Sequence, residues 1–400
     1  MRVLISGASI AGPVLAYWLA RYGFEVTLVE RAPVLRKSGG HAVDLFRPAM
    51  AIVGKMALLN EIREKKTGTD AIVIHHDTGD PVTLDLRKVY SAVSDDHVEI
   101  MRDDLSEIFY NATGNDAEYV FADSIASISE DGEVVFERGA PRRFDVIVGA
   151  DGLHSNVRTL TFGPDSGSST WIGGYLSVFS VPADLADNGV MYVCTSVGRM
   201  AGVYTADHID DGRAVFLFRT PQELRYHHRN VARQKQLLRA HFADMGWEVP
   251  QLLSLLEDTP TFYFDSITQL RLDTWSRGRV TLVGDAGYCP GPAVGGSTSL
   301  AVVGAYTLAG ELATHMPDHT KAFASYEREI GDYARRSRDF AVRAAKRLVP
   351  ANATGLWALV QTAQLVSVLP GGVSRTLAKI GARGLRLHDM VAVKDYPPLG

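Results

Sequence analysis

Cysteine is scarce in this chain, because its 400 residues include only Cys194 and Cys289. Two thiols so far apart exclude a disulfide framework and do not have the spacing of metal ligands. This cysteine usage is typical of a reducing compartment, so we expect a cytoplasmic protein.

An excess of positive charge is also missing. The chain has 41 Lys and Arg against 46 Asp and Glu, a formal net charge of −5. Binding to nucleic acid requires a basic face that neutralises phosphates, so this balance argues against a nucleic-acid partner. With 46% hydrophobic and 22% charged residues, the composition is that of a globular protein long enough for two or three domains.

Long apolar runs are absent as well. The apolar N-terminus is interrupted early by glycines and lacks the pattern of a signal peptide. The stretch Gly355–Gly371 is too short to span a bilayer and contains Gln361 and Gln364. We therefore expect no membrane partner, and we interpret this stretch as a buried or interfacial helix.

The N-terminus has the order strand, glycine turn, helix, strand. Arg2 to Ser6 is a short apolar run, and "PVLAYWLARYG" (Pro13 to Gly23) has helical spacing. A second strand, "EVTLVE", ends in Glu30. This order and length predict a βαβ unit that binds a dinucleotide.

The turn itself reads "GASIAG". Gly7 permits a tight turn and Gly12 close helix packing, whereas Ser9 stands where backbone must approach a pyrophosphate. Glu30 is placed to accept hydrogen bonds from ribose hydroxyls and would repel a 2′-phosphate, which favours FAD or NAD over NADP. A turn of small residues without a ligand, and a simple surface acid at Glu30, remain the alternatives.

Two later stretches repeat the pattern of a strand that ends in a glycine loop. "FDVIVGADGLHSNVR" (144–158) breaks at Asp151, and "GRVTLVGDAGYCPGPAVGGSTSL" (278–300) breaks at Gly284 and Asp285. The second continues through a Gly/Pro loop into a helix near Ser297. A third match is "EIMRDDLSEIF", with Arg102 on a helix.

With these segments in this order, the chain resembles the FAD-dependent aromatic-ring hydroxylases of the p-hydroxybenzoate hydroxylase type, the group A flavoprotein monooxygenases. It looks most similar to tetracycline-inactivating and polyketide-tailoring monooxygenases. The resemblance implies an α/β fold: a glutathione-reductase-type FAD-binding Rossmann domain, an inserted antiparallel-sheet substrate domain and a long C-terminal helix. The expected segments are FAD-binding domain 1–70, 97–165 and 272–318, substrate domain 71–96 and 166–271, and C-terminal helical region 319–400.

The resemblance also implies which residues bind FAD. They come from the glycine turn, the end of the second strand, the following loop, the helix at Arg102 and the two later glycine loops. The expected set is Gly7, Ser9, Ile10, Ala11, Gly12, Glu30, Arg31, Arg36, Gly40, Arg102, Asp151, Gly284, Asp285, Pro292, Gly295, Gly296, Ser297 and Thr298. Three have structural alternatives: a solvated charge at Arg36, an ion pair of Arg102 with its neighbouring acids, and a loop-fixing role for Asp151.

Several positions depart from the family pattern. Tyr288 stands where a histidine is usual, Gly304 where an aspartate is common, and Ser299 where asparagine is expected. We expect Thr298 and Ser299 to cap the helix and donate to the flavin carbonyls. We interpret Cys289 as a packing residue.

The segments between the FAD motifs contain strand-like runs that would cover the flavin and form an apolar cavity. The aromatic candidates for its lining, each with core packing as the alternative, are Tyr175, Tyr192, Tyr204, Phe216 and Phe218. The pairs His75-His76 and His227-His228 are interpreted as surface residues. Lys321–Leu348 predicts one long helix that clamps the domains, with a membrane-surface or partner-binding helix as the alternative.

In such enzymes the flavin performs the chemistry, through a C4a-hydroperoxide formed with O2 after reduction by NADPH or NADH. The resemblance therefore implies a monooxygenase of an aromatic or polycyclic substrate, with a tetracycline-like molecule as one candidate, with no catalytic side chain and no metal, as a monomer or homodimer. The alternatives are a FAD oxidoreductase that does not insert oxygen, of ene or quinone reductase type, and a nucleotide-binding regulator.

Overall fold

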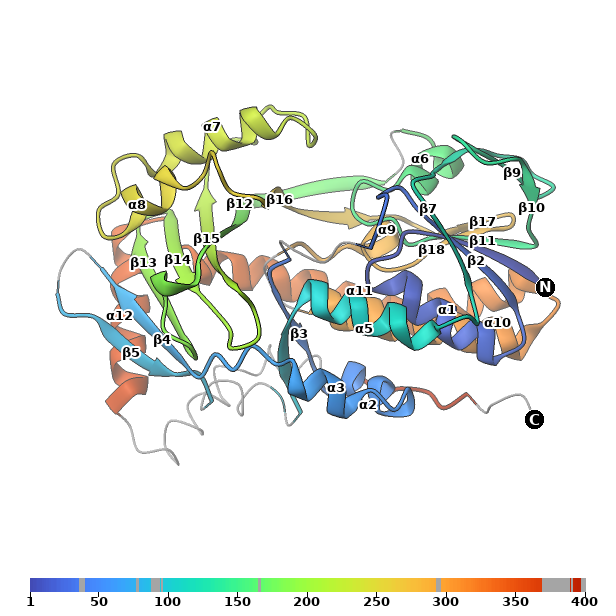
Figure 1. Ribbon diagram of the computed structural model, residues 1–400, viewed down its shortest axis with the longest axis horizontal. Helices are drawn as coiled ribbons and strands as arrows, with labels where there is room; N and C mark the ends of the chain where they lie inside the picture. Colours follow the sequence, from blue (N-terminus) through green and yellow to red (C-terminus); the bar gives the residue numbers. More distant parts are fainter. Residues whose placement is uncertain are drawn as a thin grey trace.

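The computed structural model describes residues 1–35, 40–76, 79–87, 94, 96–164, 167–292, 296–368, 389 and 391–396. Arg36 and Gly295 of the expected site lie outside the described residues. The molecule has two lobes, and the long helix α11 (His319–Leu348) runs along both of them (Figure 1).

The first lobe is built on a six-stranded sheet in the order β17-β18-β11-β1-β2-β7. The central strand β1 pairs in parallel with β2 and β11, and only β17 runs antiparallel. The strands are β1 (Arg2–Ser6), β2 (Glu25–Glu30), β7 (Glu118–Phe121), β11 (Val146–Gly149), β17 (Ser276–Arg277) and β18 (Val280–Leu282). The central strands are almost wholly buried and apolar, as in parallel sheets covered on both faces.

Helices and a small sheet cover this parallel sheet. Helix α1 begins two residues before the predicted Pro13 and packs against α5 and α10. The helices are α1 (Ala11–Arg21), α2 (Arg47–Lys55), α3 (Leu59–Glu64), α5 (Arg102–Thr113), α6 (Asn156–Phe162), α9 (Asp285–Tyr288) and α10 (Ser297–His315). The small antiparallel sheet consists of β8 (Ile125–Ile128), β9 (Glu133–Phe136) and β10 (Arg142–Arg143).

The second lobe is a seven-stranded sheet in the order β16-β12-β15-β14-β13-β4-β5. Its strands are β4 (Ala71–His75), β5 (Val82–Asp85), β12 (Ser168–Pro182), β13 (Val190–Ser196), β14 (Arg199–Tyr204), β15 (Asp211–Arg219) and β16 (Phe262–Arg271). Every pair is antiparallel except β4 with β13, so the expected antiparallel sheet is corrected at this pair. No hairpin joins these two strands, so nothing imposes opposite directions on them.

The outer face of the sheet packs against α7 (Val231–Phe242) and α8 (Val249–Ser254). Tyr175, Phe216 and Phe218 are buried in this outer core, so the core-packing alternative holds for these three. Alternate residues of a strand point to opposite faces, and it is Val215 and Leu217 that face the first lobe.

Further elements connect the lobes. A two-stranded ribbon of β3 (Ala42–Leu45) and β6 (Val98–Met101) lies between them, and α11 contacts both α10 and β12, as predicted for a clamp (Figure 1). Helix α12 (Ala353–Val368) packs on β4 and β5 through Val360 and Ala363 but leaves Trp357 64% exposed, so it is an interfacial helix. A short 3-10 turn spans Ala183–Leu185. Within the described ranges, no helix combines the length and hydropathy needed to cross a membrane.

Candidate cofactor and substrate site

The turn after β1 has no room for side chains at its first and last glycines. Gly7 has a φ of +108°, and a Cβ on it would lie 2.6 Å from the carbonyl oxygen of Ala150. A Cβ on Gly12 would lie only 1.9 Å from the carbonyl oxygen of Gly7. Ile10 and Ala11 are buried where α1 begins. The close approach places the free N–H groups of the helix N-terminus at the end of the sheet, where an anion is stabilised.

Ser9, which replaces the middle glycine, is joined to a distant segment. Nη2 of Arg102, the first residue of α5, donates to Oγ of Ser9 over 3.0 Å. The neighbouring Asp103 accepts a hydrogen bond from the N–H of Gly40 instead. Arg102 is thus directed at the glycine turn, where its guanidinium faces the same space as the helix N-terminus.

Glu30 ends β2, as predicted, and its carboxylate closes the turn. Its Oε2 accepts from the N–H of Ala8 over 2.9 Å and its Oε1 from the N–H of Ala32 over 2.8 Å. Each carboxylate oxygen has a further lone pair, so both bonds leave acceptor capacity for a ribose hydroxyl. Arg31 is exposed.

The third glycine loop lies against the first. A Cβ on Gly284, whose φ is +67°, would lie 3.4 Å from the Cβ atoms of both Ala11 and Ala301. Asp285 follows at the start of α9; burial raises its pKa, whereas the charge of Arg102 acts in the opposite direction. Segments far apart in sequence therefore bring a carboxyl, a guanidinium and two glycine turns together.

Asp151 occupies the middle loop and holds its conformation. Its Oδ1 accepts from the hydroxyl of Ser155, and its Oδ2 accepts from the N–H groups of Asn156 at 2.8 Å and Val157 at 3.0 Å. Burial raises the pKa of this carboxyl, and these hydrogen bonds act in the opposite direction. The geometry favours the loop-fixing alternative for Asp151.

Gly296 is the N-cap of α10, with a φ of +86°. Ser297 and Thr298 form the first turn of this helix and are half-buried, as is Pro292 in the preceding loop. The helix thus starts where it was predicted.

Ser299 is engaged differently from its expected role. Its buried hydroxyl donates to the carbonyl of Asp44 over 3.1 Å and accepts from the N–H of Phe46 over 2.9 Å, which ties β3 to α10. Cys289 is buried and its thiol donates to the carbonyl of Thr268, consistent with a packing role.

Two departures from the family pattern compensate each other. A Cβ on Gly304 would lie 2.0 Å from the hydroxyl oxygen of Tyr288 and 3.2 Å from its Cζ. That hydroxyl lies 3.0 Å from the hydroxyl of Tyr326. The larger residue at 288 therefore uses the space left free by glycine at 304.

This complementarity predicts a non-additive pair of substitutions. Gly304→Ala alone should destabilise the fold by about 2 kcal/mol through overpacking. In the Tyr288→Phe background, the same change should cost at least about 1 kcal/mol less, because the clashing oxygen is gone. Thermal or denaturant unfolding of the four proteins measures the coupling, and additive effects would contradict the argument.

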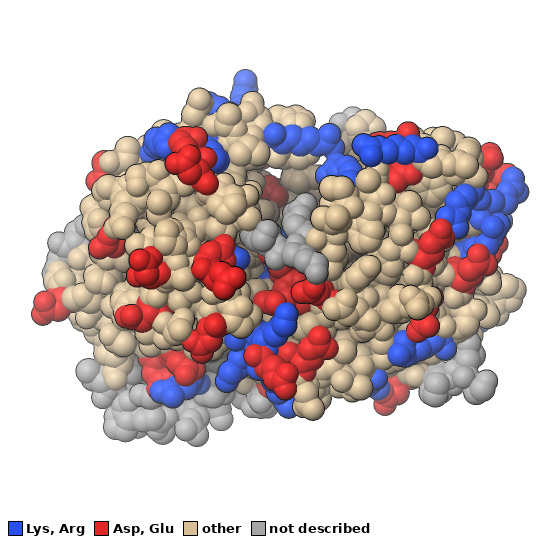
Figure 2. Space-filling view, in the orientation of Figure 1, with Lys and Arg blue, Asp and Glu red and all other residues tan. Residues whose placement is uncertain are grey.

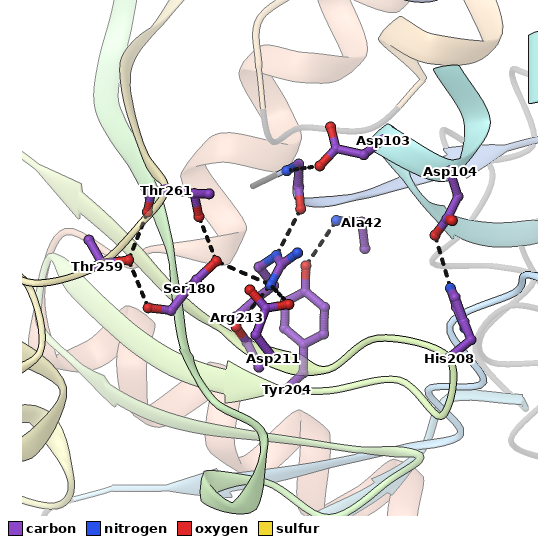
Figure 3. Close-up of polar contacts among 12 residues, drawn as sticks. Ala42, Asp103, Asp104, Ser180, Tyr204, His208, Asp211, Arg213, Thr259 and Thr261 are labelled. Carbon is purple, nitrogen blue, oxygen red and sulfur yellow. Dashed lines mark hydrogen bonds and ion pairs between the residues drawn. The ribbon is translucent and has the colours of Figure 1, made fainter. Parts of the chain in front are cut away.

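The second lobe holds the backbone that follows Gly39 (Figure 3). Arg213, only 3% exposed, donates its Nε to the carbonyl of Gly40 over 3.0 Å. The hydroxyl of Tyr204 accepts from the N–H of Ala42 over 2.9 Å. The turn at 40–42 is thus positioned from β14 and β15 of the other lobe.

Arg213 and Ala42 are absent from the sequence-predicted residues, whereas Gly40 was expected at the FAD site and Tyr204 among the cavity aromatics. One feature of the sequence could have identified Arg213. It shares the inward face of β15 with Val215 and Leu217, and a cation on an apolar face needs buried partners. His41 and Tyr263 were also not predicted; their rings lie 5.4 Å apart. Burial and Arg102 lower the pKa of His41 to about 4, so its ring is neutral near pH 7.

The two histidine pairs differ in environment. His227 and His228 are exposed, as predicted, and His228 stacks on His154 with centroids 4.4 Å apart. His75 and His76 are half-buried and line a cavity of about 260 Å³ beside Trp247, so the surface prediction is wrong for them. Within the described ranges, no cluster of His, Cys, Asp and Glu has the arrangement of a metal site.

The profile of the family described as "FAD binding domain" matches residues 1–341. A flavin-dependent monooxygenase of Legionella longbeachae is 34% identical over 345 residues, which cover 86% of this chain and 88% of that protein. An uncharacterized protein of Mycobacterium tuberculosis is 42% identical over 340 residues, which cover 84% and 91% of the two chains.

Among solved structures, the tetracycline destructase Tet(51) superposes with a TM-score of 0.83 at 32% identity, covering 99% of each chain. The chain is therefore similar along nearly its full length to an enzyme of that description.

Proposed function

This chain belongs to the FAD-binding domain family and is a flavin-dependent monooxygenase, and we propose that it hydroxylates an aromatic or polycyclic, polyketide-like molecule. NADPH or NADH would be the reductant. The observation that supports this most is the convergence of Gly7, Gly12, Arg102 and Asp285 at one helix N-terminus. We further propose a cytoplasmic enzyme that is a monomer or homodimer, with the domain limits given above.

The residues at this convergence fit FAD. The glycines leave backbone N–H groups free for the pyrophosphate, Arg102 supplies a planar fork of donors, and Glu30 can accept from the ribose. Asp285 would serve the ribitol side, and the N-terminus of α10 would face the pyrimidine end of the ring. Bound FAD supplies the activation of O2 and the transfer of one oxygen atom to the substrate.

The substrate would lie between the lobes, where the surface is hollowed (Figure 2). Partly buried apolar side chains from both lobes pack against one cluster of buried residues and would border this space; they include Ala42, Ile172, Met191, Met200 and Ile209. Methionine adapts its shape to a ligand, and an apolar wall excludes water from the reaction. The likeness to Tet(51) makes a tetracycline the first compound to test.

The experiment is a screen on purified protein that carries FAD. Tetracycline and a series of polycyclic phenols are added with NADPH or NADH, and cofactor oxidation, hydrogen peroxide and product mass are followed. We expect faster oxidation with at least one compound and incorporation of one labelled oxygen atom from O2. Product formation without O2 would instead support an oxidoreductase that inserts no oxygen, and a protein unable to bind FAD would refute the proposal.

A further inference from the structure

The ribbon of β3 and β6 turns one face toward the hollow between the lobes. Val43 and Leu45 of β3 point into the core of the first lobe, whereas Ala42 packs with the apolar residues of the second lobe. Asp44 is two residues after Ala42 and so points to the same side as Ala42. On β6, Met101 likewise packs toward the second lobe, and Glu99 shares its face.

This face carries two acids directly opposite each other. Ala42 is paired with Met101 and Asp44 with Glu99 in the antiparallel ladder. Like charges at such a position repel and destabilise a sheet. Burial and the charge of Asp44 raise the pKa of Glu99, which is the direction expected from this repulsion.

A histidine completes the group. Nε2 of His97 lies 2.7 Å from Oδ1 of Asp44, and its side chain is 7% exposed against 30% for Asp44. Asp44 is therefore the more exposed member of the pair, and His97 supports it from the buried side. The contact between the imidazole and the carboxylate holds the Asp44 side chain in place.

The other polar groups around the pair have defined places. Glu99 also contacts the hydroxyls of Thr67 and Thr69, and its charge acts on Tyr204 of β14. His41 directly precedes β3, and the charges of both Asp44 and Arg102 act on its ring. Because the pKa of His41 is lowered to about 4, its ring does not compete as a cation near neutral pH.

We propose that Asp44 is a catalytic residue that accepts the proton of a phenolic or enolic hydroxyl of the substrate, and that His97 is the residue that positions it. This inference rests on the proposed function. The O–H bond of the substrate breaks, the proton passes to Asp44, and the electron pair remains on the substrate oxygen. No electrons are exchanged in this step. The anion delocalises its charge into the ring, which makes the ring carbon a better nucleophile toward an electrophilic oxygen.

The test compares two phenols that differ in acidity, 2-naphthol and the more acidic 6-cyano-2-naphthol, on FAD-loaded enzyme. Asp44→Asn and His97→Gln should lower the turnover of 2-naphthol near neutral pH by a factor of about 100. The loss should be smaller for 6-cyano-2-naphthol, and turnover should recover above the pH at which the free phenol ionises. The matched control is His208→Gln, which removes another His–Asp pair, 2.9 Å from Asp104, and should leave turnover unchanged.

A second readout does not depend on turnover. Without NADPH or NADH, the absorption of the bound naphthol should be that of the naphtholate in the wild type and of the neutral phenol in both variants. If the variants retain naphthol-stimulated turnover, or lose it equally for both phenols at every pH, the role of the pair is overturned. The proposed function is unaffected by that result. If neither naphthol stimulates the wild type, the phenol substrate class fails and the inference falls with it.

Discussion

Replacing Gly12 by alanine is expected to give a protein that binds FAD at least about 100-fold more weakly and is colourless after purification, a loss of roughly 2.7 kcal/mol. The new Cβ would lie 1.9 Å from the carbonyl oxygen of Gly7, which is backbone and cannot rotate away. The strand and the helix must then separate, and the N–H groups that bind the pyrophosphate move with them. Titration of the apoprotein with FAD, followed by flavin fluorescence, measures the change.

The control for this prediction is the same substitution at an unhindered site. Gly331 lies inside α11, and a Cβ built there meets nothing within 4 Å. Gly331→Ala should stabilise the protein by about 0.5–1 kcal/mol through helix propensity and leave FAD binding unchanged. Wild-type FAD affinity in Gly12→Ala would show that the turn does not hold the cofactor.

Removing the buried cation that joins the lobes should also have a large effect. Arg213→Met is expected to destabilise the protein by about 3 kcal/mol, because the carbonyl of Gly40 and the ion-pair partner Asp211 lose their donor. The turn at 40–42 would lose its support from the second lobe. We therefore also expect a larger share of NADPH or NADH oxidation to end in hydrogen peroxide, because a loosened site admits water.

Denaturant unfolding and the ratio of peroxide to product measure these two effects separately. The matched control is Arg199→Met, since Arg199 lies on the neighbouring strand β14 and pairs with Asp244 at the surface. A pair of this kind contributes at most about 1 kcal/mol, so the control should remain near wild-type stability. Equal losses in both variants would mean that Arg213 has no special place between the lobes.

Local backbone chemistry made much of the first lobe predictable. A short apolar run followed by glycines and a helical pattern specifies β1, the turn and α1, because only glycine fits at positions 7 and 12. The position of Glu30 at the end of β2 follows from the same unit. These features depend on neighbours within about 30 residues, which a linear pattern contains.

The roles of several side chains could not be derived in this way. Asp151 and Asp285 each lie in a glycine loop after a buried strand, yet one caps a helix and the other lies beside Arg102. The partners of Asp151 lie within six residues of it, whereas Arg102 is far from Asp285 in the sequence, so only the tertiary structure brings the second pair together. Ser299 likewise bonds to β3, a strand far from it in sequence, rather than pointing along its own helix axis.

By itself, therefore, the sequence determined the family, the FAD cofactor and the backbone of the nucleotide turn, because these depend on short segments with strict steric demands. Only the tertiary structure decided which face of each strand meets the hollow, and so that Phe216 and Phe218 pack outward while Asp44, Tyr204 and Arg213 point between the lobes. Strand periodicity gives two equivalent faces, and packing against another element is what distinguishes them.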